Sequence, residues 1–263
     1  MSTTSESAFA CHGLTVTVPG RTLVQDLRMA VDCGDFLAVL GQNGAGKSLT
    51  LLTLAGLRKH DQGEVLLLGE SLESQRRQDI ARNLALLPQY TEDVFPTTVL
   101  DTALIGRHPH IGRLQWESIE DRSIAQDALQ QMDLGSMQDR DVATLSGGER
   151  RRLAIAQTLT QTPAVYLLDE PTNHLDPQHQ LDVLNVFRKQ TESGAAIIAS
   201  LHDVNLAARY ADKCLLLFGD GRWELGPTDS VLCEERLTEL YATPMEAIHW
   251  RDTRLFVAAE NAY

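Results

Sequence analysis

The sequence has few cysteines, a shortage of positive charge and no long apolar run, and each shortage disfavours a class of protein. Lysine and arginine number 23 against 36 aspartate and glutamate residues, so the 263 residues carry a formal net charge of −13. Nucleic-acid binding requires clustered basic side chains that neutralise phosphates, so no nucleic-acid partner is expected. The four cysteines form no C-x-x-C pair and have no clustered histidine partners, which disfavours a zinc site and a disulfide framework.

No part of the chain reads as a membrane span or a secretory signal. The longest stretch without a charged residue, 153–168, is interrupted by glutamines, threonines and a proline, whereas a spanning helix needs roughly 18 apolar residues. Residues 1–10 contain no basic segment followed by an apolar run. We therefore expect a chain that stays in the cytoplasm and does not cross a bilayer by itself.

Short apolar runs alternate with helix-length segments along most of the chain. The runs are compact, as strands buried on both faces of a sheet should be; they cover 36–40, 65–68, 84–87, 165–168 and 195–201. Hydrophobic residues make up 43% of the sequence, which is ordinary for a folded chain. The alternation predicts an α/β core with a mostly parallel sheet.

Two regions depart from this alternation. Residues 96–143 are helical in composition, and 121–132 carry apolar side chains at helical spacing, which predicts a helical subdomain inserted into the core. Beyond residue 212, the segments 213–218 and 222–225 flank Gly219-Asp220-Gly221 and predict a hairpin. A short helix near 230–241 and a β-rich tail are expected to follow.

The first chemical motif is a glycine-rich loop that fits G-x-x-x-x-G-K-[ST]. It consists of Gly41, Gln42, Asn43, Gly44, Ala45, Gly46, Lys47 and Ser48, and it stands between an apolar strand and a helix-forming run, 49–57. Such a loop wraps phosphates with its backbone N–H groups at a helix N-terminus, with Lys47 on the β- and γ-phosphates and Ser48 on Mg²⁺. The alternative, a glycine-rich turn without a ligand, leaves the flanking strand and helix unexplained.

A second motif supplies two carboxylates. The apolar run 165–168 ends in Asp169 and Glu170, and a buried strand delivers such residues to the edge of the sheet where ligands bind in α/β folds. Asp169 would hold Mg²⁺ through its water shell, and Glu170 could act as a general base toward water. The alternative is that the two acids only cap a strand.

A third motif has no role in a generic P-loop enzyme. Leu145-Ser146-Gly147-Gly148-Glu149 opens a helix-forming run, 150–159, ahead of Asp169. Here the sequence closely resembles the nucleotide-binding subunits of ABC transporters, and the resemblance covers nearly the whole chain. Gln89 matches the Q-loop of that family, 173–176 matches the D-loop, and His202 matches the switch histidine.

The resemblance implies a fold, cofactors and a division of the chain. The fold is a P-loop NTPase core with an antiparallel β-rich N-terminal part and an inserted helical subdomain. The expected units are a catalytic core over 8–88 and 144–226, a helical subdomain over 89–143 and a C-terminal helix and β-rich tail over 227–263. The expected ligands are ATP and Mg²⁺.

The resemblance also implies roles for single residues. Glu170 activates water, His202 contacts the γ-phosphate, and Gln89 links the metal and the nucleotide to the helical subdomain. The segment from Ser146 to Glu149 serves the ATP held by a second copy, and Asp176 reaches across the seam of that head-to-tail dimer. Two ATP molecules would close the dimer, and hydrolysis would reopen it.

Two positions depart from the family pattern. Val18 stands where the family usually has an aromatic residue that stacks on adenine, so base stacking is in doubt. Leu49 stands where a threonine usually follows the loop, with Thr50 next. One hydroxyl contact to the nucleotide is therefore expected to be missing.

Finer features resemble the importers of ferric siderophores, haem and vitamin B12. They are the segment 105–110, the segment 171–176 and the segment 201–212. The partners implied are two membrane-spanning permease subunits and, indirectly, a substrate-binding protein, with the chain on the cytoplasmic face of the inner membrane. Other importers, exporters and, least favoured, soluble ABC ATPases remain open as alternatives.

The helical subdomain is expected to receive a short cytoplasmic helix of each permease subunit. Its apolar floor would be drawn from Phe95, Val99, Leu100, Ala103 and Leu104. The alternative is that these side chains form the subdomain's own core.

Overall fold

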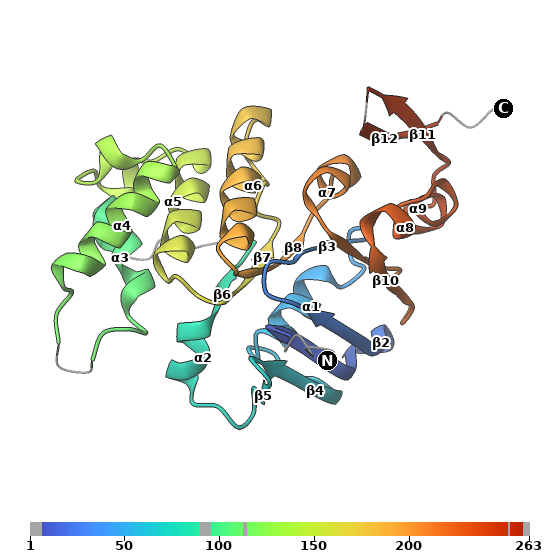
Figure 1. The fold of residues 1–263 in the computed structure, drawn as a ribbon, viewed down its shortest axis with the longest axis horizontal. Helices are drawn as coiled ribbons and strands as arrows, with labels where there is room; N and C mark the ends of the chain where they lie inside the picture. The colour runs from blue at the N-terminus through green and yellow to red at the C-terminus, as the bar shows by residue number, and fades with distance from the viewer. Residues whose placement is uncertain (1–6, 90–95, 113–114, 252, 260–263) are drawn as a thin grey trace, which may run out of the picture.

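The computed structural model of the protein describes residues 7–89, 96–112, 115–251 and 253–259. Figure 1 shows three regions along the longest axis of the molecule. Helices α3, α4 and α5 lie at one end, two sheets with their covering helices fill the middle, and the small β11–β12 sheet lies at the other end.

The central sheet has the strand order β10-β9-β3-β8-β7-β6. Its parallel strands are β3 (Phe36–Leu40), β6 (Leu84–Leu87), β7 (Val165–Asp169), β8 (Ala196–Ser200) and β9 (Lys213–Leu217). Only β10 (Trp223–Pro227) is antiparallel, and it pairs with β9 through the predicted hairpin. The predicted mostly parallel sheet is confirmed.

A second, fully antiparallel sheet has the order β2-β1-β4-β5. Its strands are β1 (Phe9–Val18), β2 (Arg21–Val31), β4 (Gln62–Leu67) and β5 (Glu70–Ser71). The run 65–68, expected to be a strand buried on both faces, belongs to β4 of this sheet. Leu68 lies beyond the strand, in the turn to β5, with φ 52°, and is 45% exposed. The expectation for this run was therefore wrong, since β4 ends at Leu67 in an antiparallel sheet.

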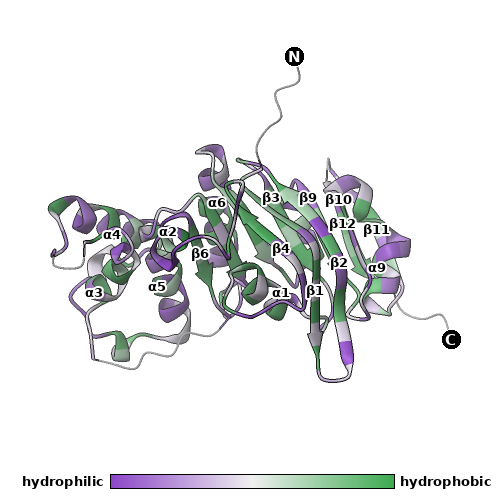
Figure 2. Ribbon diagram, turned by 90° about the horizontal axis from the view of Figure 1, so that it is seen from below, coloured by the Kyte–Doolittle hydropathy of each residue, from purple (hydrophilic) through white to green (hydrophobic). Residues whose placement is uncertain are grey.

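Strand β3 is buried on both faces and separates two hydrophobic cores. Phe36, Ala38 and Leu40 pack in a core shared with helices α3 to α7, whereas Leu37 and Val39 pack in a core shared with α1 (Lys47–Leu54) and the antiparallel sheet. This division follows from the two-residue period of a strand. Figure 2 shows the hydrophobic colour concentrated on the central strands.

Three more helices belong to the core: α2 (Arg77–Asn83) leads from the antiparallel sheet into β6, whereas α6 (Pro177–Glu192) and α7 (Val204–Tyr210) each connect two parallel strands. Helix α1 begins two residues earlier than the predicted run 49–57 and ends at Leu54, because Gly56, with φ 65°, follows in the left-handed region.

Helices α3 (Val99–Leu104), α4 (Ile119–Gln131) and α5 (Gly147–Thr160) pack against one another. Three short 3₁₀ turns connect them: η1 (Ile105–Arg107), η2 (Gly135–Met137) and η3 (Val142–Thr144). Val99, Leu100, Ala103 and Leu104 are buried in the core of this helical region. They therefore form its own core rather than an apolar floor for a partner, and Phe95 lies outside the described residues.

The C-terminal part contains two helices where one was expected near 230–241. They are α8 (Thr228–Val231) and α9 (Glu234–Tyr241), and Leu232, in an extended conformation, separates them. The expected β-rich tail is the antiparallel hairpin of β11 (Met245–Trp250) and β12 (Thr253–Ala258). Over the described ranges, no helix combines the length and hydrophobicity that a membrane span requires.

The segment 105–110 fastens the helical region to the core. Gly106 lies so close to α5 that a Cβ atom there would approach the carbonyl oxygen of Gln157 to 2.3 Å. Pro109 O accepts hydrogen bonds from α2, and the His110 Nε2 atom lies 2.9 Å from Gln161 O. This segment therefore has a packing role of its own.

Arg107, in the same segment, forms a buried ion pair with Asp121 of α4. Arg107 Nε donates to Asp121 Oδ1 at 2.8 Å, and the Ser118 backbone N–H and hydroxyl donate to Oδ2. These hydrogen bonds, led by the one from Arg107, lower the pKa of Asp121 to about 2. Because the folded-state pKa lies below the usual value, the stabilisation is present above about pH 4 and is lost as the pH falls toward 2.

Substitution D121N should lower the free energy of unfolding by about 2 kcal/mol at pH 7, since the buried Arg107 loses its charged partner. Urea titrations followed by circular dichroism at pH 7 and at several values down to pH 2 would measure this. The difference from wild type should shrink below pH 4. Exposed Asp127 on the same helix provides the control D127N. A difference that stays constant to pH 2 would contradict the assignment.

Candidate nucleotide site

The motif residues meet at one edge of the central sheet because four adjacent parallel strands end there. The glycine-rich loop follows β3, Gln89 follows β6, Glu170 follows β7 and His202 follows β8. The carboxyl ends of parallel strands are where open α/β sheets bind ligands. Topology therefore assembles side chains that are far apart in the sequence.

The glycine-rich loop runs directly into the N-terminus of α1. Gly46 is in the left-handed region with φ 101°, and a Cβ atom there would come within 3.0 Å of the Leu23 side chain. No side chain caps the helix, so its first backbone N–H groups face the loop, where a phosphate is favoured. Lys47 is 5% exposed, and its Nζ donates to Gly41 O at 2.8 Å. Burial lowers the pKa of Lys47, and nearby Glu170 and Asp169 partly offset that effect.

A cavity of about 380 Å³ lies over this loop. Its lining contains most of the residues predicted from the sequence: Val18, Gln42, Asn43, Gly44, Gly46, Lys47, Ser48, Leu49, Gln89 and Glu170. Gly41 and Ala45 are buried behind the lining, where Gly41 packs against Leu217 O. The lining also includes Arg21 and Leu23, which the sequence analysis did not single out.

Glu170 is held at the cavity by three side chains from different elements. Its Oε2 accepts from Gln89 Nε2 at 2.7 Å and from Asn173 Nδ2 at 2.9 Å, and its Oε1 lies 2.5 Å from His202 Nε2. The backbone of Glu170 has φ 49°, a conformation that costs a non-glycine residue about 1 kcal/mol or more. The backbone of buried Glu170 is therefore strained, and both of its carboxylate oxygens are held in place by neighbouring side chains.

Asp169 lies beneath the cavity and does not line it. It is buried, and its Oδ1 accepts from Ser200 Oγ at 2.7 Å, while the same hydroxyl accepts from the Glu170 backbone N–H at 2.9 Å. Ser200, at the end of β8, therefore fixes both acids. Its hydroxyl in an otherwise apolar strand was the sequence signal for this role.

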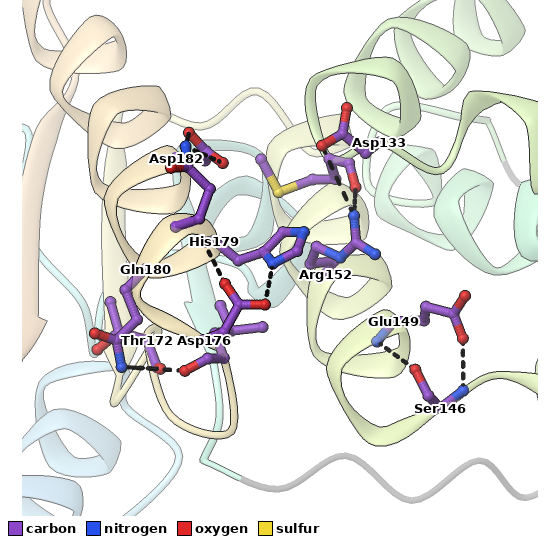
Figure 3. Close-up of polar contacts among 12 residues, drawn as sticks. Asp133, Ser146, Glu149, Arg152, Thr172, Asp176, His179, Gln180 and Asp182 are labelled. Atoms are coloured by element: carbon purple, nitrogen blue, oxygen red, sulfur yellow. Dashed lines mark hydrogen bonds and ion pairs between the residues drawn. The ribbon is translucent and has the colours of Figure 1, made fainter.

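The segment from Ser146 to Glu149 begins helix α5 and does not line the cavity of its own chain. The Ser146 hydroxyl accepts from the Glu149 backbone N–H at 3.3 Å, and Glu149 Oε2 accepts from the Ser146 backbone N–H at 2.7 Å, as Figure 3 shows. This capping box fixes the start of the helix. Gly147 has open space where a Cβ atom would stand.

Asp176 also lies apart from that cavity, at the start of α6. It caps the helix by accepting from the His179 backbone N–H at 3.0 Å, and Oδ2 lies 2.8 Å from His179 Nδ1 (Figure 3). These bonds lower the pKa of Asp176. Gly148 and the D-loop are close, because a Cβ atom on Gly148 would lie 3.7 Å from His174 O.

The two family departures have different surroundings. Val18 stands in the lining beside Arg21, whose Nε donates to Gly219 O at 2.7 Å. Leu49 also lines the cavity, but Thr50 is buried and does not, and its hydroxyl has no hydrogen-bond partner among the described residues. Thr50 therefore does not replace the hydroxyl that the family usually has at position 49.

The lining suits a phosphate chain with a bound Mg²⁺. Backbone N–H groups, the helix N-terminus and Lys47 supply positive potential, while the Ser48 hydroxyl and Gln89 amide supply oxygen atoms. The Gln89 amide nitrogen donates to Glu170, so its amide oxygen is the atom left for a metal. Asp169 adds negative charge beneath them.

Comparison with known proteins identifies the family. The profile of the ABC transporter family matches residues 24–173. The chain belongs to the ABC transporter family. It is an ABC-type ATPase with that family's mixed α/β fold.

Curated relatives match most of the chain. A hemin import ATP-binding protein of Deinococcus radiodurans is 41% identical over 220 residues, which are 82% of each chain. A petrobactin import ATP-binding protein of Bacillus anthracis is 35% identical over 90% of this ABC ATPase and 87% of the relative. An achromobactin transport ATP-binding protein of Dickeya dadantii is 37% identical over 87% of this chain and 85% of its own length.

Solved structures share the fold. An inward-facing metal-chelate type ABC transporter superposes with a TM-score of 0.84 at 29% identity, over 97% of this chain and 98% of that one. A bacterial Atm1-family ABC exporter with ATP bound gives a TM-score of 0.75 at 24% identity, over 92% of this chain and 42% of that one. Because an exporter shares the fold, the fold alone does not decide the direction of transport.

Proposed function

We propose that this chain is the ATP-hydrolysing subunit that energises import of a metal chelate, such as haem or a ferric siderophore, through a membrane ABC transporter. The observation that carries the proposal is the identity of 35–41% to hemin and siderophore import ATP-binding proteins over most of the chain. ATP hydrolysis is supported by the cavity over the glycine-rich loop, which includes the start of α1 and the Glu170 carboxylate held by Gln89 and His202.

The site residues divide the work of hydrolysis. The loop from Gly41 to Ser48 and the start of α1 hold the phosphates of ATP, and Lys47 neutralises the β- and γ-phosphates. Glu170 orients the attacking water and accepts its proton, since its carboxylate lines the cavity. His202, at 2.5 Å from Glu170, stabilises charge on the γ-phosphate.

Mg²⁺ would be held by Ser48, by Gln89 and, through water, by Asp169, and it would supply positive charge to the β- and γ-phosphate oxygens. Ser200 keeps Asp169 aimed toward this position. Gln89 is shared between the metal position and Glu170, so it connects the nucleotide to the segment that leads into the helical region.

The complete site requires a second copy. Ser146, Gly147, Gly148 and Glu149 form a helix N-terminus that lies outside the cavity of their own chain, and the open space at Gly147 would admit a phosphate closely. In a head-to-tail dimer they would contact the γ-phosphate held by the partner, with Asp176 at the seam. Closure on two ATP molecules and reopening after hydrolysis would provide the motion that drives transport.

The division of labour follows the proposed units. The core of 8–88 and 144–226 would bind ATP, the helical subdomain of 89–143 would meet the cytoplasmic helices of two permease subunits, and 227–263 would close the fold. A substrate-binding protein would deliver the chelate outside. The chain would act as a peripheral protein on the cytoplasmic face of the membrane.

Substitution E170Q should lower ATP hydrolysis about a hundredfold or more, because an amide cannot accept the proton of water. ATP binding should change less than about threefold, since a glutamine keeps the polar contacts of Glu170. Phosphate release and equilibrium binding of ATP would measure the two effects. Sedimentation velocity with ATP should show E170Q accumulating as a dimer.

The matched control for this experiment is E192Q, at the exposed end of α6. It should hydrolyse ATP as wild type does. Unchanged hydrolysis by E170Q would remove Glu170 from the role of base. A monomer at all ATP concentrations would contradict the dimer.

Arg21 and Val18 would contact the adenine base. Both stand at the β1–β2 turn, away from the strand ends that carry Gln89 and Glu170, and both line the cavity. A guanidinium group stacks on flat aromatic rings, and Arg21 is fixed through Gly219 O. Arg21 would thus supply the planar contact that Val18 cannot.

Substitution R21A should weaken ATP binding about tenfold through the lost stacking, while binding of inorganic tripolyphosphate, which has no base, stays unchanged. Isothermal titration with Mg²⁺ and each ligand would measure both affinities. Adding V18Y to R21A should restore ATP affinity. The exposed R28A on β2 is the control. Equal losses for ATP and tripolyphosphate would mean that Arg21 acts on the phosphate loop through Gly219 instead.

Import itself is tested in cells from which the chromosomal gene has been deleted. Uptake of radiolabelled haem, ferric siderophore and vitamin B12 should fall about tenfold or more for one of these ligands. A plasmid carrying the wild-type gene should restore it, and one carrying E170Q should not. Unaltered uptake of all three, with ATP hydrolysis intact in the purified protein, would overturn metal-chelate import while leaving the ATPase assignment in place.

A further inference from the structure

Arg151 has an unusual position between the helical region and the carboxyl ends of β6 and β7. It lies on α5, two residues after Glu149 of the capping box, and it is 5% exposed. Its Nη1 donates to Pro88 O at 2.7 Å and to Gln89 O at 3.3 Å. Its Nη2 donates to Asp169 O and to Glu170 O, each at 2.7 Å. One guanidinium therefore joins the carboxyl ends of two neighbouring strands.

Burying this charge costs free energy. Arg151 donates to carbonyl oxygens, and its buried Nε has no hydrogen-bond partner among the described residues. Burial lowers the pKa of Arg151 to about 10, and the charges of Asp169 and Glu170 partly offset that effect. An apolar side chain often fills such a place with equal or greater stability. The free-energy cost of burying the charge therefore points to a role for Arg151 beyond packing.

Three of the four carbonyl groups belong to residues proposed to act in hydrolysis, Gln89, Asp169 and Glu170, and the fourth belongs to Pro88 directly before Gln89. The Gln89 side chain donates to Glu170, and Glu170 holds its strained φ of 49° directly after Asp169. A planar guanidinium has a rigid fork of donors, so it fixes the separation of the groups that it bridges. Any rotation of α5 would therefore move Gln89 and Glu170 together.

We propose that Arg151 is a positioning residue that couples the partner-facing end of α5 to the catalytic glutamate of the same chain. This inference rests on the proposed function, because Ser146 to Glu149 would meet the nucleotide of the second copy. When that helix end is seated on the partner's ATP, Arg151 holds Glu170 and Gln89 in register for hydrolysis of the chain's own ATP. Each site would thus respond to occupancy of the other.

Substitution R151M keeps an unbranched stem on α5 but removes the guanidinium donors. It should lower kcat about a hundredfold, because Glu170 loses its fixed position, while the dissociation constant for ATP stays within about threefold of wild type. The dependence of rate on ATP concentration should lose its cooperativity, with the Hill coefficient falling from about 2 to about 1. R151K, which keeps the charge but reaches fewer carbonyl groups, should be intermediate in both respects.

The matched control is R152M, one residue further along α5. Arg152 points away from the strand ends: it donates to Met132 O and lies 3.9 Å from exposed Asp133 in the helical region, as Figure 3 shows. R152M should keep the wild-type kcat and Hill coefficient. Thermal unfolding of all the variants would establish that they are folded at the assay temperature, and R151K provides the result if R151M does not fold.

Retention of kcat and of cooperativity by R151M, or by R151K if only R151K folds, would overturn the proposal. So would a parallel loss of ATP affinity and kcat, because that pattern indicates a merely structural role. The E170Q variant separates these outcomes from the proposed function. If wild type hydrolyses ATP and E170Q does not, the ATPase assignment stands whatever the Arg151 variants do.

Discussion

The site depends on one constraint, which is that four neighbouring parallel strands must end at the same edge of one sheet. Register between β6, β7 and β8 brings Gln89, Glu170 and His202 close enough to bond to one another. Backbone pairing thus brings together the side chains proposed to act in catalysis. The local strain at Glu170 is tolerated because its side chain and backbone are bonded on several sides.

Two hydrophobic cores hold that sheet edge rigid. Because β3 alternates its side chains between the cores, the phosphate loop that follows it is supported from both faces of the sheet. The helical region is fastened at two separated places. The segment 105–110 binds it to α2, and Arg151 binds the N-terminal part of α5 to the strand ends. The two attachments leave the first turn of α5 as a presented surface rather than a buried end.

That arrangement gives a physical reason for the proposed pairing of two copies. One chain contains a cavity lined by the glycine-rich loop and the Glu170 carboxylate. The N-terminus of α5 in the same chain does not line that cavity. A subunit whose site is finished by another copy can convert nucleotide binding into motion between copies. The hairpin of β11 and β12 lies at the opposite end of the molecule from the helical region (Figure 1), so it stands apart from these elements.

The sequence by itself determined the element types, the phosphate loop and the order of the motifs, because these depend on local periodicity and on short contiguous patterns. The apolar runs 36–40, 84–87, 165–168 and 195–201 were sufficient to predict a parallel sheet. The same reasoning placed 65–68 wrongly, since a short apolar run does not reveal which sheet it will join. It also joined α8 and α9 into one helix.

Only the tertiary structure decided which distant groups touch. The structure joins Ser200 to Asp169 and Glu170, Arg21 to Gly219, and Arg151 to four carbonyl groups. None of these partners is a neighbour in the sequence. Burial of Val99, Leu100, Ala103 and Leu104 likewise depends on how α3 packs against α4 and α5. Strand register and helix packing set these contacts, and neither can be predicted from a short segment of the sequence.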